Sequence, residues 1–268
     1  QAKLVAGDRV GGDKFGESVW ISGEYAIIGA RLEDPGGTID AGSAYIFKRT
    51  GTTWSEQAKL VANDKQQGDN FGWSVSISGD YAIVGAYVKS GGGAAYIFTR
   101  NVDTWSQQKI LGLDTIAGDQ YGSSVSISGD YAIVGARDKN GTIGAAYIFT
   151  RSGDTWTQQQ KIVASDGVGS DFFGHSAAID GDYAIVGASN KGGGTGATYI
   201  FKREGTTWSQ VVKLVADDPG SSDKFGWSVS ISGDYVISGA PYEDTRGANA
   251  GAAYIYPFEP LLDFDNFN

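Results

Sequence analysis

Short segments of alternating hydrophobic and polar residues recur along this chain. In residues 74–78, valine and isoleucine alternate with serine, which is the period of a β-strand with one buried face. The nearby segment 81–86 is almost wholly apolar, as a strand requires when other sheets pack on both of its faces. Between the two segments, Gly79 and Asp80 form a tight-turn signal. No segment sustains an apolar period of 3.6 residues, so the pattern predicts β-strands and no long helices.

Two more strands complete the predicted unit. A glycine-rich loop leads to the apolar segment 94–98, and a polar turn then leads to 104–110, which begins with a threonine-tryptophan pair. The letters SISGDYAIVGA occur unchanged at 76–86 and at 126–136, so this unit is repeated. A repeated unit of four short strands in ~50 residues is typical of a β-propeller blade.

Two short motifs recur once in each repeated unit and so give the number of units. An aromatic-glycine pair opens each of them, and its aromatic residues are Phe15, Phe71, Tyr121, Phe173 and Phe225. Successive aromatics are 56, 50, 52 and 52 residues apart. A glycine-alanine pair begins fourteen residues after each aromatic, at Gly29, Gly85, Gly135, Gly187 and Gly239. The chain therefore contains five copies of the unit.

The two ends of the chain predict how the ring closes. The fifth unit stops after its third strand, and residues 1–6 are identical to residues 57–62, the end of a fourth strand. We therefore predict an all-β, five-bladed β-propeller of four-stranded antiparallel blades over residues 1–256, with the N-terminal strand completing the last blade and closing the ring. Residues 257–268 form a C-terminal tail. A fragment of a larger propeller is the alternative.

The order of the two motifs resembles the FG-GAP repeat. Phe225-Gly226 followed by Gly239-Ala240-Pro241 carries the complete pattern, and the resemblance extends over all five units. Such repeats build the β-propeller of integrin α-subunits and of related surface proteins. The resemblance implies an extracellular propeller used for adhesion or ligand binding. Integrin-type repeats often carry a DxDxDG calcium loop, and this sequence contains none.

Composition excludes several classes of function. The 21 basic and 31 acidic residues give a net charge of −10, which opposes binding to nucleic acid. The chain has no cysteine and one histidine, so thiolate and multi-histidine metal sites are excluded. No run of 18 apolar residues exists, so no membrane span is expected. The chain begins at Gln1 and contains no methionine, as a cleaved mature form would, and we expect an extracellular or cell-surface location.

One variable position in the repeat points to a ligand site. In a four-stranded blade, the connections between blades and those between the second and third strands share one face, which we call the top face. The residue after each aromatic-glycine pair opens the innermost strand near this face. These residues are Glu17, Trp73, Ser123, His175 and Trp227. Such side chains can stack on and hydrogen-bond a sugar ring, and the alternative is that they fill a narrow channel.

The top face also carries a pair of aspartates in every unit, five residues apart. The pairs are Asp8 and Asp13, Asp64 and Asp69, Asp114 and Asp119, Asp166 and Asp171, and Asp218 and Asp223. Strict recurrence favours a scaffold role, in which each aspartate caps a turn through the backbone. Calcium binding by these oxygens is the alternative. We expect no required cofactor.

These observations favour a non-enzymatic adhesion or binding module whose partner is a glycan or a surface protein. Glu17 and Asp180 are the acids on the predicted inner strands, which is thin support for a glycosidase. The alternative function is a structural subunit that self-associates head to tail into a filament or surface layer, with the acidic top face meeting a basic bottom face. The basic residues of that bottom face are Lys48, Arg49, Arg100, Arg151, Lys202 and Arg203.

Overall fold

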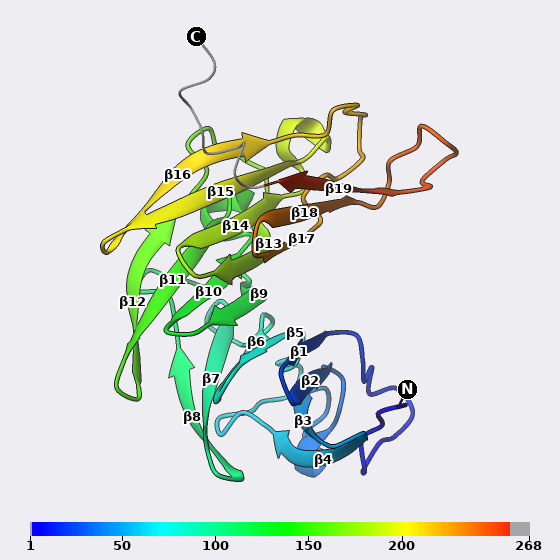
Figure 1. Ribbon diagram of the computed structural model, residues 1–268, viewed down its shortest axis with the longest axis vertical. Coiled ribbons are helices and arrows are strands. Elements are labelled where there is room, and N and C mark those ends of the chain that lie inside the picture. Colours follow the sequence, from blue (N-terminus) through cyan, green and yellow to red (C-terminus); the bar gives the residue numbers. More distant parts are fainter. Residues whose placement is uncertain (1, 258–268) are drawn as a thin grey trace.

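The computed structural model describes residues 2–257, which form five antiparallel sheets arranged around a common centre (Figure 1). The first blade contains β1 (Val19–Ser22), β2 (Tyr25–Ala30), β3 (Ser43–Thr50) and β4 (Thr53–Leu60). The second contains β5 (Ser74–Ser78), β6 (Tyr81–Ala86), β7 (Ala94–Asn101) and β8 (Thr104–Ile110). The third contains β9 (Tyr121–Ser128), β10 (Tyr131–Ala136), β11 (Ala145–Ser152) and β12 (Thr155–Ile162).

The last two blades follow the same order. The fourth contains β13 (Phe173–Asp180), β14 (Tyr183–Ala188), β15 (Ala197–Glu204) and β16 (Thr207–Leu214). The fifth contains β17 (Ser228–Ser232), β18 (Tyr235–Ala240) and β19 (Ala252–Pro257). Short helical turns occupy three connections between second and third strands: 3-10 turns at Pro35–Gly37 and Lys191–Gly193, and α1 (Lys139–Thr142). The prediction of five antiparallel blades is confirmed.

The first strand of each blade lies innermost, and the fourth strand lies at the outer rim (Figure 1). Residues from β1, β5, β9, β13 and β17 together line an axial cavity of about 190 Å³. Its polar groups include Ser22, Ser78, Ser128 and Asp180. These polar residues stand at the C-terminal ends of the inner strands. The top-face connections lead into the N-terminal ends of the same strands, at the other end of the axis.

Close backbone approach between blades explains the two glycine motifs. A Cβ added to Gly85 would lie 2.1 Å from the carbonyl oxygen of Gly122, which belongs to the aromatic-glycine pair of the next blade. Gly122 has φ +90°, a left-handed conformation that favours glycine. The aromatic partner Tyr121 is fully buried. The motifs therefore mark where the backbone of one blade meets the next.

Apolar side chains fill the space between neighbouring blades. Ile83 and Ile97 of the second blade pack in one buried cluster with Val125, Ile127 and Val134 of the third. Equivalent clusters join the first blade to the second, the third to the fourth and the fourth to the fifth. These interfaces explain why the second strand of a blade is apolar on both faces.

The expected closure of the ring by the N-terminal strand is wrong. Among the described residues the fifth sheet has three strands, and residues 2–6 form no strand. Leu4 and Ala6 pack against the first blade instead, and Asp8 accepts hydrogen bonds from Tyr45 and Lys59 of that blade. These contacts hold the segment on the first blade.

Both flanks at this point stay open to solvent. Ile21 on the first blade is 63% exposed and Ile255 on the fifth is 64% exposed, whereas Ile77, Ile127 and Ile179, the equivalents of Ile21 in the second to fourth blades, are buried. The predicted tail, residues 257–268, lies outside the described residues apart from Pro257, which ends β19.

No helix within residues 2–257 is long and apolar enough to cross a membrane.

Candidate functional site

The first aspartate of each top-face pair is held by hydrogen bonds. In the second blade, the hydroxyl of Tyr96 donates to Asp64 Oδ1 over 2.7 Å, and Lys109 Nζ donates to Asp64 Oδ2 over 2.7 Å. Asp8, Asp114 and Asp166 have the same two partners in their blades, and Asp218 accepts from the hydroxyl of Tyr254. This network joins each blade-to-blade connection to the third and fourth strands of the following blade.

Hydrogen bonds from the lysine and tyrosine partners lower the pKa of these aspartates. Burial acts to raise the pKa of Asp114, but hydrogen bonds from Lys161 and Tyr147 outweigh it and lower the pKa to about 2. The same balance, with Lys213 and Tyr199 as donors, lowers the pKa of Asp166 to about 2. These carboxylates are therefore ionised at neutral pH.

The second aspartate of each pair caps a turn, as the scaffold interpretation predicts. Asp69 Oδ2 accepts from the backbone N–H of Gln66 over 2.7 Å, and the other four pairs repeat this bond three residues apart. In the second, third and fourth blades a lysine also reaches this oxygen, as Lys89 does at 2.7 Å from Asp69.

Lysines thus occupy oxygens that calcium would need. No group of three or more histidine, aspartate or glutamate side chains among the described residues is arranged to hold a metal ion. Calcium binding at the aspartate pairs stays a prediction, and in the middle blades it would require displacing a lysine.

Three of the six bottom-face cations, Arg100, Arg151 and Arg203, form close ion pairs within the chain. Arg100 donates to Asp80, and its guanidinium lies 4.5 Å from the ring centroid of Tyr25 in the preceding blade. Arg151 and Arg203 repeat both contacts in their blades. The bottom face is therefore not a continuous positive surface.

The structure divides the five predicted ligand residues into separate groups. Glu17 accepts from Arg31 Nε over 2.9 Å, and the guanidinium of Arg31 lies 4.9 Å from the ring centroid of Trp73. Ser123 is 8% exposed, and its hydroxyl is directed at backbone carbonyl oxygens. His175 and Trp227 lie together, with ring centroids 4.5 Å apart. This last pair lines a cavity on the top face.

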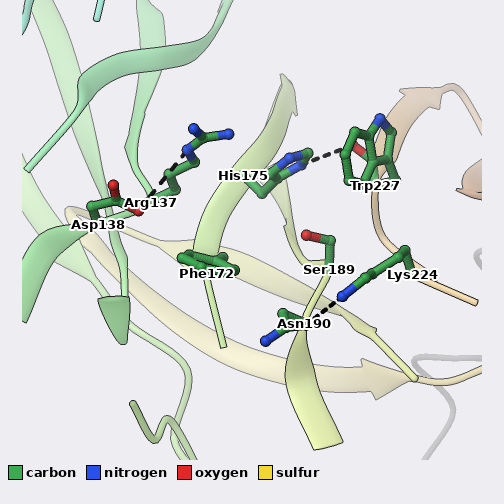
Figure 2. A pocket seen from close by; sticks show the side chains of 8 residues that line it. All are labelled: Arg137, Asp138, Phe172, His175, Ser189, Asn190, Lys224 and Trp227. Carbon is green, nitrogen blue, oxygen red and sulfur yellow. Dashed lines mark hydrogen bonds and ion pairs between the residues drawn. The ribbon is translucent and has the colours of Figure 1, made fainter. Parts of the chain in front are cut away.

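This top-face cavity has a volume of about 310 Å³ and is formed by three blades (Figure 2). Arg137 and Asp138 reach it from the connection after β10. The fourth blade contributes Phe172 and His175 at the start of β13, and Ser189 and Asn190 after β14. Lys224 and Trp227 come from the connection before β17. Aromatic, cationic and amide groups therefore meet in one hollow.

The imidazole of His175 is neutral at physiological pH. Burial and the nearby charge of Arg137 lower its pKa to about 4, against the opposing effect of the Trp227 carbonyl. His175 Nδ1 lies 3.1 Å from this carbonyl oxygen, so Nδ1 carries the proton and donates. Nε2 is left as a hydrogen-bond acceptor.

Asp138 is the one carboxylate that lines the cavity. Burial raises its pKa, although the charge of Arg137 acts in the opposite direction. Its Oδ1 lies 3.9 Å from Arg137 Nε, too far for a direct hydrogen bond. Asp138 therefore adds a further acceptor to the cavity wall.

Two repeat positions that line the cavity are not among the five predicted site residues. The residue before each aromatic-glycine pair is Lys14, Asn70, Gln120, Phe172 or Lys224, and all five have positive φ, between 54° and 61°. The residue after each glycine-alanine pair is Arg31, Tyr87, Arg137, Ser189 or Pro241. Both positions vary between units, as the predicted ligand position does. This variability is the feature of the sequence that could have identified them as site residues. A left-handed non-glycine residue carries backbone strain, which is often kept where a side chain must be displayed.

The acids considered for glycoside hydrolysis are not neighbours. Glu17 lies at the top face, whereas Asp180 lines the axial cavity and accepts from Ser128. Their repeat positions are five residues apart along an extended strand, which is ~16 Å at ~3.3 Å per residue. A glycosidase pair requires roughly 5–9.5 Å.

Comparison with known families agrees with this architecture. The FG-GAP repeat pattern matches residues 1–47, 54–98, 105–149, 156–201 and 208–256. The chain belongs to the FG-GAP repeat family. Each match after the first begins at the tryptophan of a fourth strand and ends in the third strand of the next blade, so the FG-GAP repeat unit connects two blades. Among curated proteins, no match to this FG-GAP chain is found. An FG-GAP β-propeller is compatible with a binding module.

Proposed function

We propose that this FG-GAP propeller is a non-enzymatic binding module, placed outside the cell or on its surface, that binds a carbohydrate, free or on a glycoprotein, in the top-face cavity. The observation that carries the proposal is the cavity itself. It combines the face of Trp227, which is 41% exposed, with the acceptor Nε2 of His175 and the donors of Arg137 and Lys224. Sugar rings bind proteins through this combination of an apolar face and convergent polar groups.

The aromatic wall is built for stacking. Trp227 contacts His175 on one side, and the ring of Tyr242 meets it edge to face with centroids 5.9 Å apart. These contacts restrict the indole while leaving part of it accessible. A ligand that stacks on Trp227 would therefore lose little side-chain entropy.

The experiment is a glycan array screen followed by calorimetry with the best ligand. Trp227→Ala should weaken binding by roughly tenfold or more, because it removes the stacking surface. Trp73→Ala is the matched control, since Trp73 holds the same repeat position but lies outside the cavity, beside Tyr87 and Arg31. Equal losses in the two variants, or no glycan bound at all, would overturn the proposal.

Head-to-tail self-assembly has weaker support. It depends on complementary charges, and many of these charges are already paired inside the chain: Asp8, Asp64, Asp114 and Asp166 with lysines, and Arg100, Arg151 and Arg203 with aspartates. Sedimentation velocity provides the direct test, and a monomer of about the chain mass of 28.2 kDa is expected.

A further inference from the structure

Neither of the two cations in the top-face cavity has a carboxylate oxygen within hydrogen-bond distance. Lys224 forms no ion pair among residues 2–257, and its polar contact is with Asn190 Oδ1. Arg137 donates through Nε to Gln120 Oε1 over 2.8 Å, and its distance to Asp138 is 3.9 Å. The lysines of the aspartate network behave differently, since each lies between 2.6 and 2.9 Å from a carboxylate oxygen.

These two cations stand on different blades. Arg137 follows β10 of the third blade and Lys224 precedes β17 of the fifth, so the fourth-blade residues His175 and Phe172 lie between them (Figure 2). A group placed in the cavity would meet positive charge from two directions. The chain as a whole has a net charge of −10. Two cations in one cavity therefore make this part of the surface more favourable for an anionic group than the rest.

The other walls suit a hydroxylated ring. His175 Nε2 and the carboxylate of Asp138 are acceptors for hydroxyl donors, and Trp227 and Phe172 supply apolar surface. A simple inorganic anion would use the two cations and leave these groups without a role. A neutral sugar would use the walls and could hydrogen-bond the two cations, but it would bring no negative charge to them.

We infer that the cavity selects a sugar acid, with the carboxylate held between Arg137 and Lys224 and the ring on Trp227. This inference rests on the proposed carbohydrate function and names the class of sugar. Bonds from charged donors to a carboxylate are stronger than bonds between neutral groups, and arginine fits a carboxylate with two parallel donors. The carboxylate therefore supplies the discrimination between acidic and neutral sugars.

The test compares methyl β-glucuronide with methyl β-glucoside by calorimetry on the full chain. The glucuronide should bind at least roughly tenfold more tightly. Lys224→Gln and Arg137→Gln should each weaken glucuronide binding much more than glucoside binding, and so remove most of this preference.

The repeat offers a matched control for each variant. Lys14→Gln removes a lysine at the position equivalent to Lys224, with φ of 60° against 61°. Arg31→Gln removes the arginine equivalent to Arg137, which is paired with Glu17 outside the cavity. Neither control should change the preference for the glucuronide.

A second measurement needs no variant. His175 is the only histidine in the sequence, so its two carbon-bound ring protons, Hδ2 and Hε1, can be assigned in NMR without overlap from another imidazole. A bound carboxylate beside Arg137 and Lys224 should raise the pKa of His175 above its ligand-free value, and the glucoside should not. An unchanged pKa on glucuronide binding would overturn the inference.

The outcomes separate the two proposals. Equal affinity for glucuronide and glucoside would overturn the sugar-acid inference and leave the carbohydrate function standing. Acetate or inorganic phosphate bound as tightly as the glucuronide would overturn the assignment to a sugar. Binding of no sugar, acidic or neutral, would contradict both proposals.

Discussion

At the residue scale, the candidate site comes from variable side chains on an invariant backbone. The five residues before the aromatic-glycine pairs share a left-handed conformation, yet they include two lysines, two amides and one phenylalanine. The backbone conformation is therefore part of the scaffold, and the side chain is free to differ. Phe172 and Lys224 place this variation at the top-face cavity.

His175 provides a titration that reports on the cavity. Because burial and the charge of Arg137 depress its pKa, we expect a midpoint near pH 4 in NMR, against 6.5 for a free imidazole. The unfolded chain takes up this proton first on acidification. The free energy of unfolding should therefore fall as pH drops from about 6.5 to about 4.

Arg137→Gln should raise the His175 midpoint, because it removes a neighbouring positive charge. Arg31→Gln is the control, and it should leave the midpoint unchanged because Arg31 lies outside the cavity. A midpoint near 6.5 in the unmodified chain would show that the imidazole is neither buried nor close to Arg137.

At the element scale, the strands follow the hydrophobic pattern closely except at one end. The segments 74–78, 81–86 and 104–110 match β5, β6 and β8, whereas β7 continues to Asn101, three residues beyond its predicted apolar segment. Thr99, Arg100 and Asn101 pair with β8 through backbone hydrogen bonds. Hydrogen bonding sets this boundary, so a hydrophobic pattern cannot locate it.

Gly85 tests the close approach of neighbouring blades. Gly85→Ala should lower the free energy of unfolding by about 1–3 kcal/mol, because the new methyl group would overlap the backbone of Gly122. Chemical denaturation followed by circular dichroism measures this change. Gly79→Asn is the control, since a Cβ added to Gly79 would lie more than 4 Å from any atom beyond its chain neighbours, and asparagine tolerates the φ of +57°. Equal stability of the two variants would contradict the packing argument.

At the scale of the whole molecule, the aspartate network links each blade to the connection before it. Asp114 and Asp166 have pKa values of about 2, against about 3.8 when unpaired, because the lysine and tyrosine bonds outweigh burial. Their contribution to stability is complete above pH 3.8 and is lost as pH falls towards 2. The side chains of each pair are partly exposed, so each contribution is small, and the sum over several blades is what becomes measurable.

We therefore expect the Tm to fall between pH 4 and pH 2. Asp114→Asn should lower the Tm at pH 7 and reduce the difference between pH 4 and pH 2, because the variant has one titrating group fewer. Differential scanning calorimetry measures both quantities. A Tm that is constant from pH 4 to pH 2 would show that these bonds do not stabilise the propeller.

The sequence by itself determined the repeat, the number of blades and the order of strands within a blade. This was possible because alternating polarity and the two glycine motifs are local consequences of strand burial and of contact between neighbouring blades. It also placed His175 and Trp227 near the top face. Only the tertiary structure showed that they share a cavity with Arg137 and Lys224, because that cavity is formed by connections from three blades. Tertiary contacts likewise decided the position of residues 2–6. Their sequence matches residues 58–62, which contain the end of the fourth strand of the first blade, but they pack against the first blade and do not pair with the fifth.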